Sequence, residues 1–391
     1  MKTGIQYAIV AAFVLGIVEL ASFLATGFLV SQRIILEPPD DRGYVEYLAS
    51  RDPLLGWPAP EGMTERGFDS AGSRVTPTFP DPSVPSCVAT FGDSFTWGEE
   101  VTAEHAYGNV LSDMLGCRVA NYGVGGYGTD QALLRYRDRI VDPAPIVILG
   151  HYSDNIMRNV NQLRDLTSGA RFGFKPRFRV DDTDGLTLVP IPTLTPEEYP
   201  TVNDRAAELL PYEYFVPGRL GGPVNADFPY TRAMIGAIFH FRVVARLRGV
   251  PSYAAFYDPS HPSEALATTE AIMLEFATVA RSRGQQPLIV LIPDEKDLRA
   301  FQQGNLPAYE SLRAWLQQED LPGPDIATYM LDHLAGSDVC ELFVTCGGRS
   351  HYNERGYRLL ADGIYRWILE SSLAEALPEP SRLAAIQSEI H

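Results

Sequence analysis

The stretch Cys87-Val-Ala-Thr-Phe-Gly-Asp-Ser-Phe-Thr-Trp-Gly98 decides how the rest of the chain is interpreted. Its first residues, 87–91, form a short apolar run that ends at a glycine, which predicts a buried parallel strand. Gly92-Asp93-Ser94 follows where this strand stops, and a helical pattern begins near Thr102. A serine at such a turn lies at the carboxyl end of the sheet, where open α/β folds bind ligands. Its hydroxyl and the free N–H groups of the helix start can therefore share one corner of the molecule.

Strands and helices alternate along the chain after this first strand. The sequence predicts further strands over 118–121, 145–150, 287–292 and 326–331, and helices over 101–115, 129–140, 233–248, 265–283, 309–317 and 351–369. Alternating elements of this kind indicate a parallel sheet, here of about five strands, with helices on both faces. The expected fold class is therefore α/β.

Residues 156–286 interrupt the alternation and are expected to form a large insertion. Within it, residues 174–192 read as a β-hairpin with its turn at Asp184-Gly185. A segment rich in proline and aromatic residues follows the hairpin. An insertion of this size is usually a lid or a binding surface, and a packing element without a ligand is the alternative.

The amino-terminal residues 5–30 are nearly all apolar, with Glu19 as the only charge. At about 1.5 Å per residue, a helix of this length can cross the apolar core of a bilayer. The short apolar region and small-residue cleavage site of a signal peptide are not evident, so we expect an uncleaved signal anchor over 1–33. A carboxylate inside a membrane is costly. Glu19 is therefore expected to associate with another helix, or else to be protonated or to reach the interface.

Charge and cysteine content narrow the functional class. The formal net charge is −17 and no block is rich in lysine or arginine, which argues against nucleic-acid binding. The four cysteines fit an oxidising compartment. Cys87 can pair with Cys117 and Cys340 with Cys346, and four buried free thiols are the alternative. The sequence has neither metal-ligand spacing nor a Walker-type phosphate loop, so no metal and no cofactor are expected.

Two segments resemble the first two sequence blocks of the GDSL/SGNH hydrolases. Gly92-Asp93-Ser94-Phe95 is similar to the first block, in which the serine is the acyl-accepting nucleophile. Asn121-Tyr-Gly-Val-Gly-Gly126 is similar to the second block, and the resemblance implies that the Gly126 N–H helps to hold the oxyanion. Glycine suits that role because a side chain would obstruct the approach of the substrate oxygen to the backbone.

The third block, Gly150-His-Tyr-Ser-Asp-Asn155, departs from the family pattern at a functional residue. The family has Asn-Asp at this place, whereas this chain has Asp154-Asn155. An ionised Asp154 would repel a developing oxyanion, so it cannot replace the amide. We expect Asn155 to turn inward as the donor. The alternatives are a hole made by the backbone N–H groups of Ser94 and Gly126, or a contribution from Asn159. Asp93 and Asp154 are kept as further candidate site residues.

The fourth block, Gly348-Arg-Ser-His351, also departs from the pattern. His351 resembles the catalytic histidine, which deprotonates the serine and then protonates the leaving alcohol. The family places an aspartate three residues before this histidine, and here that residue is Gly348. A backbone carbonyl, Asp338 or Glu341 could hold the ring instead. We therefore expect a Ser–His dyad rather than a full triad.

The resemblance implies a fold and a reaction. The fold is a three-layer, flavodoxin-like SGNH domain over 87–375, with a linker and edge segment over 34–86 and a tail over 376–391. The reaction is hydrolysis of a carboxylic ester of a small molecule or glycan, with O-acetyl on an envelope sugar as one substrate. A glycan O-acyltransferase and a non-catalytic glycan-binding envelope protein are the alternatives. The protein is expected to be a single-pass membrane protein whose main domain is extracytoplasmic, in the periplasm or outside the cell.

Overall fold

The computed structural model describes the whole chain except residues 1, 58–59, 62, 182–184, 348–349 and 379–391. The chain folds into two compact units. The sheet unit comprises Asp52–Val160, Pro176–Val189 and Tyr253–His391, and the amino-terminal unit comprises Met1–Arg51, Asn161–Lys175 and Pro190–Ser252.

The centre of the sheet unit is a parallel sheet with the strand order β3-β2-β4-β8. Its strands are β2 (Ser86–Phe91), β3 (Arg118–Asn121), β4 (Ile146–Tyr152) and β8 (Gln286–Ile292). Each overlaps a predicted strand, and β2, β4 and β8 are apolar runs, because a parallel strand covered on both faces has a nearly continuous apolar sequence. The prediction of an α/β fold with a parallel sheet is confirmed.

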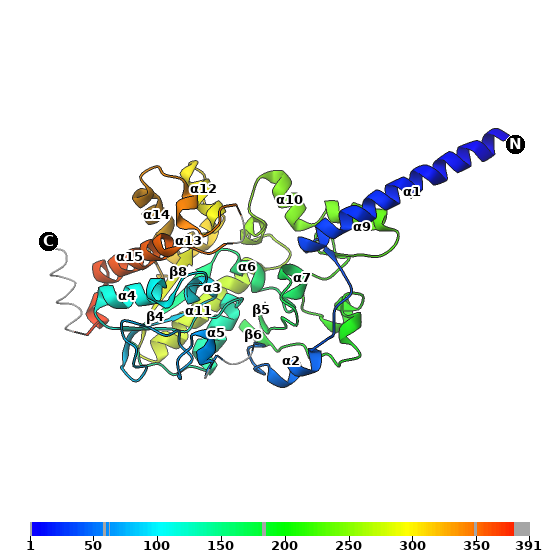
Figure 1. Cartoon of the computed structure of the whole chain (residues 1–391). Coiled ribbons are helices and arrows are strands. Elements are labelled where there is room, and N and C mark those ends of the chain that lie inside the picture. The colour runs from blue at the N-terminus through cyan, green and yellow to red at the C-terminus, as the bar shows by residue number, and fades with distance from the viewer. Residues whose placement is uncertain (1, 58–59, 62, 182–184, 348–349, 379–391) are drawn as a thin grey trace. The chain divides into compact units, whose positions relative to one another are not determined.

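Helices cover both faces of this sheet (Figure 1). One face carries α4 (Tyr107–Leu115), α14 (Ile326–Leu334) and α15 (Glu354–Glu370), and the other carries α5 (Thr129–Asp138) and α11 (Ala265–Ser282). The unit also contains α12 (Glu295–Gln302), which was not expected from the sequence, and α13 (Glu310–Gln318). The result is a layered arrangement in which the carboxyl ends of β2 and β4 open onto short helices.

The predicted strand over 326–331 is wrong, because this segment lies within α14. Its buried residues Ile326, Met330 and Leu334 recur every four positions, which is a helical spacing. Asp325 also starts the helix by accepting the N–H of Thr328. The sheet therefore has four strands rather than five in the part of the chain that the structure describes.

The predicted β-hairpin is confirmed as β5 (Arg177–Asp181) and β6 (Gly185–Val189), which pair antiparallel. The predicted turn begins at Asp184, which lies outside the described residues. The predicted helix over 233–248 is instead two helices, α9 (Tyr230–Ile238) and α10 (Phe241–Arg248). His240 separates them with an extended backbone, and its Nδ1 accepts the N–H of Arg242 at 3.2 Å.

Both expected cysteine pairings occur as disulfides, and the alternative of four free thiols is wrong. Cys87 and Cys117 join the beginnings of neighbouring strands β2 and β3, with Cα atoms 6.0 Å apart. Cys340 and Cys346 close a short loop shortly before His351, with Cα atoms 5.1 Å apart.

The amino-terminal unit is built on α1 (Lys2–Ser31), which is long and apolar enough to cross a membrane. The chain then forms β1 (Ile35–Leu36), which pairs in parallel with β7 (Val224–Asn225). Tyr44 of α2 (Tyr44–Ser50) stacks on Tyr199, with ring centroids 4.3 Å apart. Residues 34–51, expected to belong to a linker, are thus part of the packing of this unit. Its remaining short helices are α7 (Asp165–Ser168) and α8 (Ala206–Leu209).

Candidate active site

Ser94 is held at a tight turn between β2 and the short helix α3 (Ser94–Trp97). Asp93 is the N-cap of α3, and its Oδ1 accepts the N–H of Phe95 at 2.9 Å. A Cβ atom on Gly92 would lie 2.0 Å from Thr96 Oγ1, so only glycine fits immediately before this turn. The turn therefore fixes the serine hydroxyl at the carboxyl end of β2, as the sequence predicts.

His351 meets Ser94 at this end of the sheet. Its Nε2 lies 2.8 Å from Ser94 Oγ, although the two residues are 257 positions apart. The backbone around the histidine is held because Val344 donates its N–H to the His351 carbonyl at 3.1 Å. Phe95 packs against the imidazole, with ring centroids 4.8 Å apart. At this distance a serine hydroxyl can donate its proton to an unprotonated imidazole.

Glu100 is the carboxylate that faces the other side of this imidazole. Its Oε2 lies 3.6 Å from His351 Nδ1 and accepts the backbone N–H of His351 at 2.9 Å. It also accepts the hydroxyl of Ser350 at 2.9 Å. Burial would raise the pKa of Glu100, but these hydrogen bonds and the nearby imidazole outweigh that effect and lower it. Glu100 is therefore an ionised group beside the ring nitrogen that does not face Ser94.

The backbone of Glu100 has a φ of 69°, a left-handed conformation that side-chain-bearing residues rarely adopt. Backbone strain of this kind is often found at functional sites. Sequence reasoning missed this residue because it looked for a carboxylate near His351. The available signal was that Glu100 closely follows the Ser94 block and so lies at the same edge of the sheet.

The two carboxylates that were expected near His351 have other partners. Asp338 Oδ1 accepts the N–H of Cys340 at 2.9 Å and lies 3.3 Å from Arg299 Nη2. Glu341 pairs with Arg355. Neither contacts His351 within the described ranges, and Gly348 lies outside them. The sequence left open whether Asp338, Glu341 or a backbone carbonyl holds the imidazole ring. In the structure, Glu100 faces the ring instead.

Asp93 and Asp154 both pair with Arg158. Asp93 is fully buried, and its Oδ2 lies 3.1 Å from Arg158 Nη1. Burial raises the pKa of Asp93, while the guanidinium opposes this shift. Asp154 Oδ2 lies 3.4 Å from Arg158 Nε, one helical turn away. Arg158 also donates to the Tyr127 carbonyl at 2.8 Å, so it ties the Ser94 turn to the loop of the second block.

The second block packs directly against the Ser94 turn. Val124 donates its N–H to the Gly92 carbonyl at 3.1 Å, and a Cβ on Gly123 would lie 2.4 Å from Trp97 N. Gly126 has a φ of 81°, which favours glycine. Neither Ser94 N–H nor Gly126 N–H donates a hydrogen bond within the part of the chain that the structure describes. Two backbone donors therefore remain available in this region.

Asn155 begins α6 (Asn155–Arg158) and is fully buried. Neither its Oδ1 nor its Nδ2 has a hydrogen-bond partner among the described residues. Asn159, the other candidate amide, donates to Thr269 Oγ1 at 2.8 Å and accepts the N–H of Asp130 at 3.3 Å. A buried amide without a hydrogen-bond partner is costly in a folded protein. The side-chain amide of Asn155 is therefore the one that a bound ligand could satisfy, whereas the amide of Asn159 already has partners.

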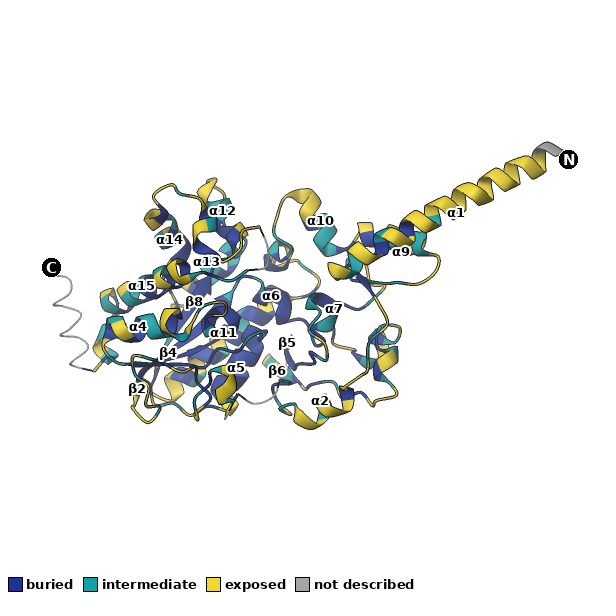
Figure 2. Cartoon of the chain, viewed as in Figure 1, coloured by how far each residue is buried: buried dark blue, intermediate teal, exposed yellow. Residues whose placement is uncertain are grey.

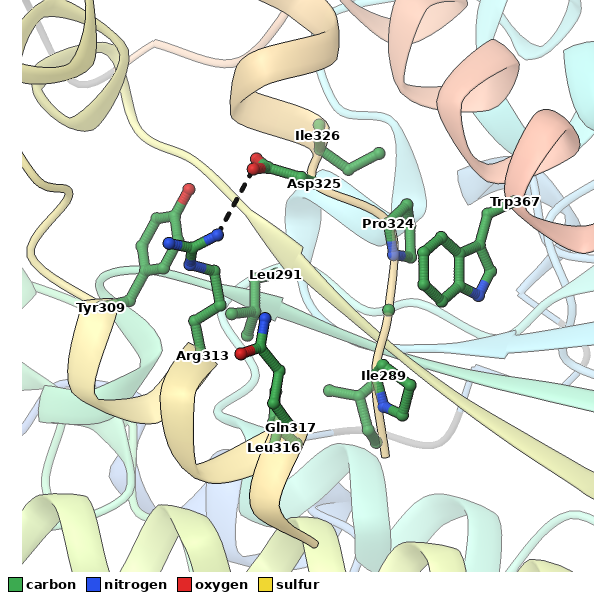
Figure 3. A pocket seen from close by; sticks show the side chains of 12 residues that line it. Ile289, Leu291, Tyr309, Arg313, Leu316, Gln317, Pro324, Asp325, Ile326 and Trp367 are labelled. Atoms are coloured by element: carbon green, nitrogen blue, oxygen red, sulfur yellow. Dashed lines mark hydrogen bonds and ion pairs between the residues drawn. The ribbon is translucent and has the colours of Figure 1, made fainter. Parts of the chain in front are cut away.

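A separate cavity of about 200 Å³ lies between β8, α13, α14 and α15 (Figure 3). Its wall combines apolar side chains, including Ile289 and Trp367, with Arg313 and Asp325, whose charged atoms are 3.5 Å apart. None of the candidate site residues lines it. The cavity therefore belongs to a different part of the sheet unit.

No family model matches the sequence, and no curated protein matches it. Solved structures to which the chain is similar include two lipolytic proteins of the G-D-S-L family. The one from Desulfitobacterium hafniense DCB-2 is 13% identical, with 71% of this chain and 97% of that chain covered and a TM-score of 0.35. The one from Veillonella parvula DSM 2008 is 13% identical, with 73% and 97% covered and a TM-score of 0.33. Likeness at this level does not inform the chemistry of this chain.

Proposed function

We propose that this protein is a serine hydrolase that cleaves carboxylic esters. The observation that carries the proposal is the 2.8 Å separation between Ser94 Oγ and His351 Nε2 at the carboxyl end of β2. A serine hydroxyl is a weak nucleophile until an adjacent base removes its proton. The proposal assigns that base to His351.

The reaction proceeds in two halves. Ser94 Oγ attacks the ester carbonyl carbon while its proton passes to His351 Nε2. The tetrahedral intermediate then collapses, the bond to the alcohol oxygen breaks, and the alcohol leaves with the proton from Nε2. In the second half, water attacks the acyl carbon while its proton passes to His351 Nε2. The bond between the acyl carbon and Ser94 Oγ then breaks, Oγ takes the proton from Nε2, and a carboxylic acid is released.

Glu100 is proposed to position the imidazole. Glu100 Oε2 accepts the backbone N–H of His351, which holds the backbone of that residue in place. The same oxygen lies 3.6 Å from His351 Nδ1. When Nε2 receives the serine proton the ring becomes positive, and a nearby carboxylate stabilises that charge. The sequence favoured a Ser–His dyad, and this geometry supports a Ser–His–Glu arrangement instead.

The oxyanion is assigned to the backbone N–H groups of Ser94 and Gly126 together with the amide of Asn155. The two N–H groups have no acceptor in the described chain, and the buried Asn155 amide has no partner. Asp154 Oδ2 lies 3.4 Å from Arg158 Nε, so the guanidinium offsets the negative charge of this carboxylate. Each donor of an oxyanion hole typically contributes about 3 kcal/mol to transition-state stabilisation.

The substrate is proposed to be an ester with a short acyl group, with O-acetyl on an envelope glycan as the favoured example. Two observations support an extracytoplasmic setting. The helix α1 is apolar enough to cross a membrane, and both cysteine pairs are oxidised. We propose that α1 anchors the protein in the membrane, with its amino end inside the cell and the sheet unit outside.

Hydrolysis of p-nitrophenyl acetate by the Ser94→Ala variant tests the proposal. The variant loses the attacking oxygen, so turnover should fall to the background rate, and a fluorophosphonate probe should label the wild type but not the variant. Ser83→Ala, which changes an exposed serine of the same unit, should keep wild-type turnover and labelling. Wild-type turnover in a correctly folded Ser94→Ala variant would refute the assignment.

A further inference from the structure

Several large apolar residues of α9, α10 and the segments beside them are exposed, and Figure 2 shows an exposed stretch on α10. They are Phe228 (77% exposed), Ile235 (57%), Ile238 (56%), Phe239 (54%) and Leu247 (78%), and we call them the α9 patch. A soluble surface seldom concentrates so many large apolar side chains without a binding partner. Contact with an apolar environment would therefore stabilise the α9 patch.

The helix α9 lies along the second half of α1. Glu19 Oε2 accepts the N–H of Thr231 at 3.1 Å and its O–H at 2.6 Å, and Glu19 Oε1 accepts the N–H of Tyr230. Further along α9, Ala233 and Ala237 belong to the same apolar cluster as Leu29 and Val30 of α1. The start of α9 is thus level with Glu19, and its end is level with the last turns of α1.

The Glu19 carboxylate serves as the N-terminal cap of α9. Pro229 occupies the N-cap position and provides no side-chain hydrogen bond. The positive end of a helix stabilises a carboxylate. Two groups that are each costly in an apolar environment, a carboxylate and free N–H groups, satisfy each other here. This is the helix association that the sequence left open for Glu19.

The chain enters and leaves this region on the same side. β7 pairs with β1 just after α1, the chain then runs to the level of Glu19, and α9 returns toward the end of α1. This path is that of a re-entrant hairpin. Its nine-residue helix is about 14 Å long at 1.5 Å per residue, which is close to the thickness of one leaflet of apolar chains.

The helix α10 adds basic groups where α1 ends. Arg242 donates to the Gln32 carbonyl at 2.7 Å, which places the start of α10 beside the residue that follows α1. Arg246 and Arg248 are exposed on the last turn of α10. Arginines at this level suit phosphate head groups, and they surround the exposed Leu247 as in helices that lie in a membrane interface.

We infer that α9 and α10 form a second membrane contact, in which the α9 patch enters the lipid leaflet at the carboxyl end of α1. The occupant of the patch is lipid, because α9 packs along α1, whose own apolar residues Leu24 (69% exposed) and Phe28 (62%) are exposed and would face lipid in a membrane. The inference rests on α1 crossing the bilayer and is independent of the chemistry at Ser94.

Depth-dependent quenching of tryptophan fluorescence tests the inference on the full chain in phosphatidylcholine vesicles. The native tryptophans (Trp57, Trp97, Trp315 and Trp367) all belong to the sheet unit, so their signal is measured on the wild type and subtracted. Phe239→Trp places a probe in the α9 patch, and Val141→Trp places a control on a 95% exposed residue of the sheet unit.

Lipids brominated on their acyl chains should quench the residue-239 signal at least threefold more than the residue-141 signal. Adding Glu19→Ala to Phe239→Trp should reduce this quenching by half or more, because α9 loses its cap. Equal quenching at the two probe positions would overturn the inference. Cross-linking of two chains by a reactive group introduced at position 239, without quenching by the brominated lipids, would also overturn the inference. A second copy of the chain would then cover the patch.

Discussion

Two histidines of the sheet unit lie beside hydroxyl groups but in different environments. His351 faces Ser94 Oγ at 2.8 Å on one side and the Glu100 carboxylate at 3.6 Å on the other. His151 is buried between Thr129 Oγ1 at 2.7 Å and the Tyr257 hydroxyl at 2.9 Å. A hydrogen bond to a hydroxyl therefore does not distinguish a base from a structural histidine.

The difference is whether the surroundings tolerate a positive ring. Burial lowers the pKa of His151 to about 3, and Arg158 adds to this shift. His151 thus stays neutral and cannot accept a proton during a reaction near neutral pH. His351 is less deeply buried, and the Glu100 carboxylate lies 3.6 Å from its Nδ1, whereas His151 has hydroxyl groups at both ring nitrogens.

The largest contrast should come from replacing each histidine with glutamine. His351→Gln removes the proposed base, so kcat for p-nitrophenyl acetate should fall by about 10³-fold or more. His151→Gln should retain most of the activity at a temperature where it is folded. If His351→Gln kept wild-type kcat while His151→Gln lost it, the assignment of the two roles would be reversed.

A smaller effect on activity should follow from Glu100→Gln. The amide keeps the shape of the side chain and loses the charge that faces Nδ1, so kcat should fall by about 10- to 100-fold with little change in KM. If Glu100 acts through its charge, the pH at which kcat/KM reaches half its maximum should also move down, because the imidazolium then loses the nearby carboxylate and the unprotonated base forms at lower pH. A purely structural Glu100 would leave that profile in place. Glu99→Gln is the matched control and should behave as wild type, since the Glu99 side chain is exposed.

The smallest effect should be a change in stability with pH that depends on His151. Folding lowers the pKa of His151 from its ordinary value of 6.5 to about 3. Between these two pH values the unfolded chain binds a proton at His151 that the folded chain does not bind. Stability should therefore fall from pH 6.5 toward pH 3, with a contribution from this residue of roughly 1.4 kcal/mol per pH unit at most. Chemical denaturation of wild type and His151→Gln at several pH values measures it. Identical pH dependence in both proteins would contradict the assignment.

The sequence predicts the sheet well and the long-range contacts poorly. All four strands were predicted, three of them as apolar runs, because burial on both faces leaves little choice of residue. The same rule misassigned 326–331, since a short apolar run does not distinguish a strand from a buried helix. The resemblance placed Ser94 and His351 at one rim of the sheet, and the structure holds them in contact. Their chemistry stays a prediction.

Neither the contact of Glu100 with the His351 segment nor the contact of Glu19 with α9 could be derived from apolar runs or from the resemblance. The Glu100 contact joins residues about 250 positions apart and depends on a left-handed backbone at Glu100. The Glu19 contact joins α1 to a helix 211 positions later in the chain. No local pattern encodes such pairs, because they arise only when distant segments pack together.

The separation of Ser94 and His351 along the chain has a consequence for biogenesis. Synthesis begins at the amino end, so β2 and its serine are made early, whereas α15 and the loop before it are made much later. Ile364 and Ile368 of α15 join the same core as Leu111 of α4, so this helix must dock before the imidazole reaches the hydroxyl. A nascent chain therefore cannot assemble the Ser94–His351 pair until α15 has been made, and a product that ends before His351 would carry Ser94 without its partner.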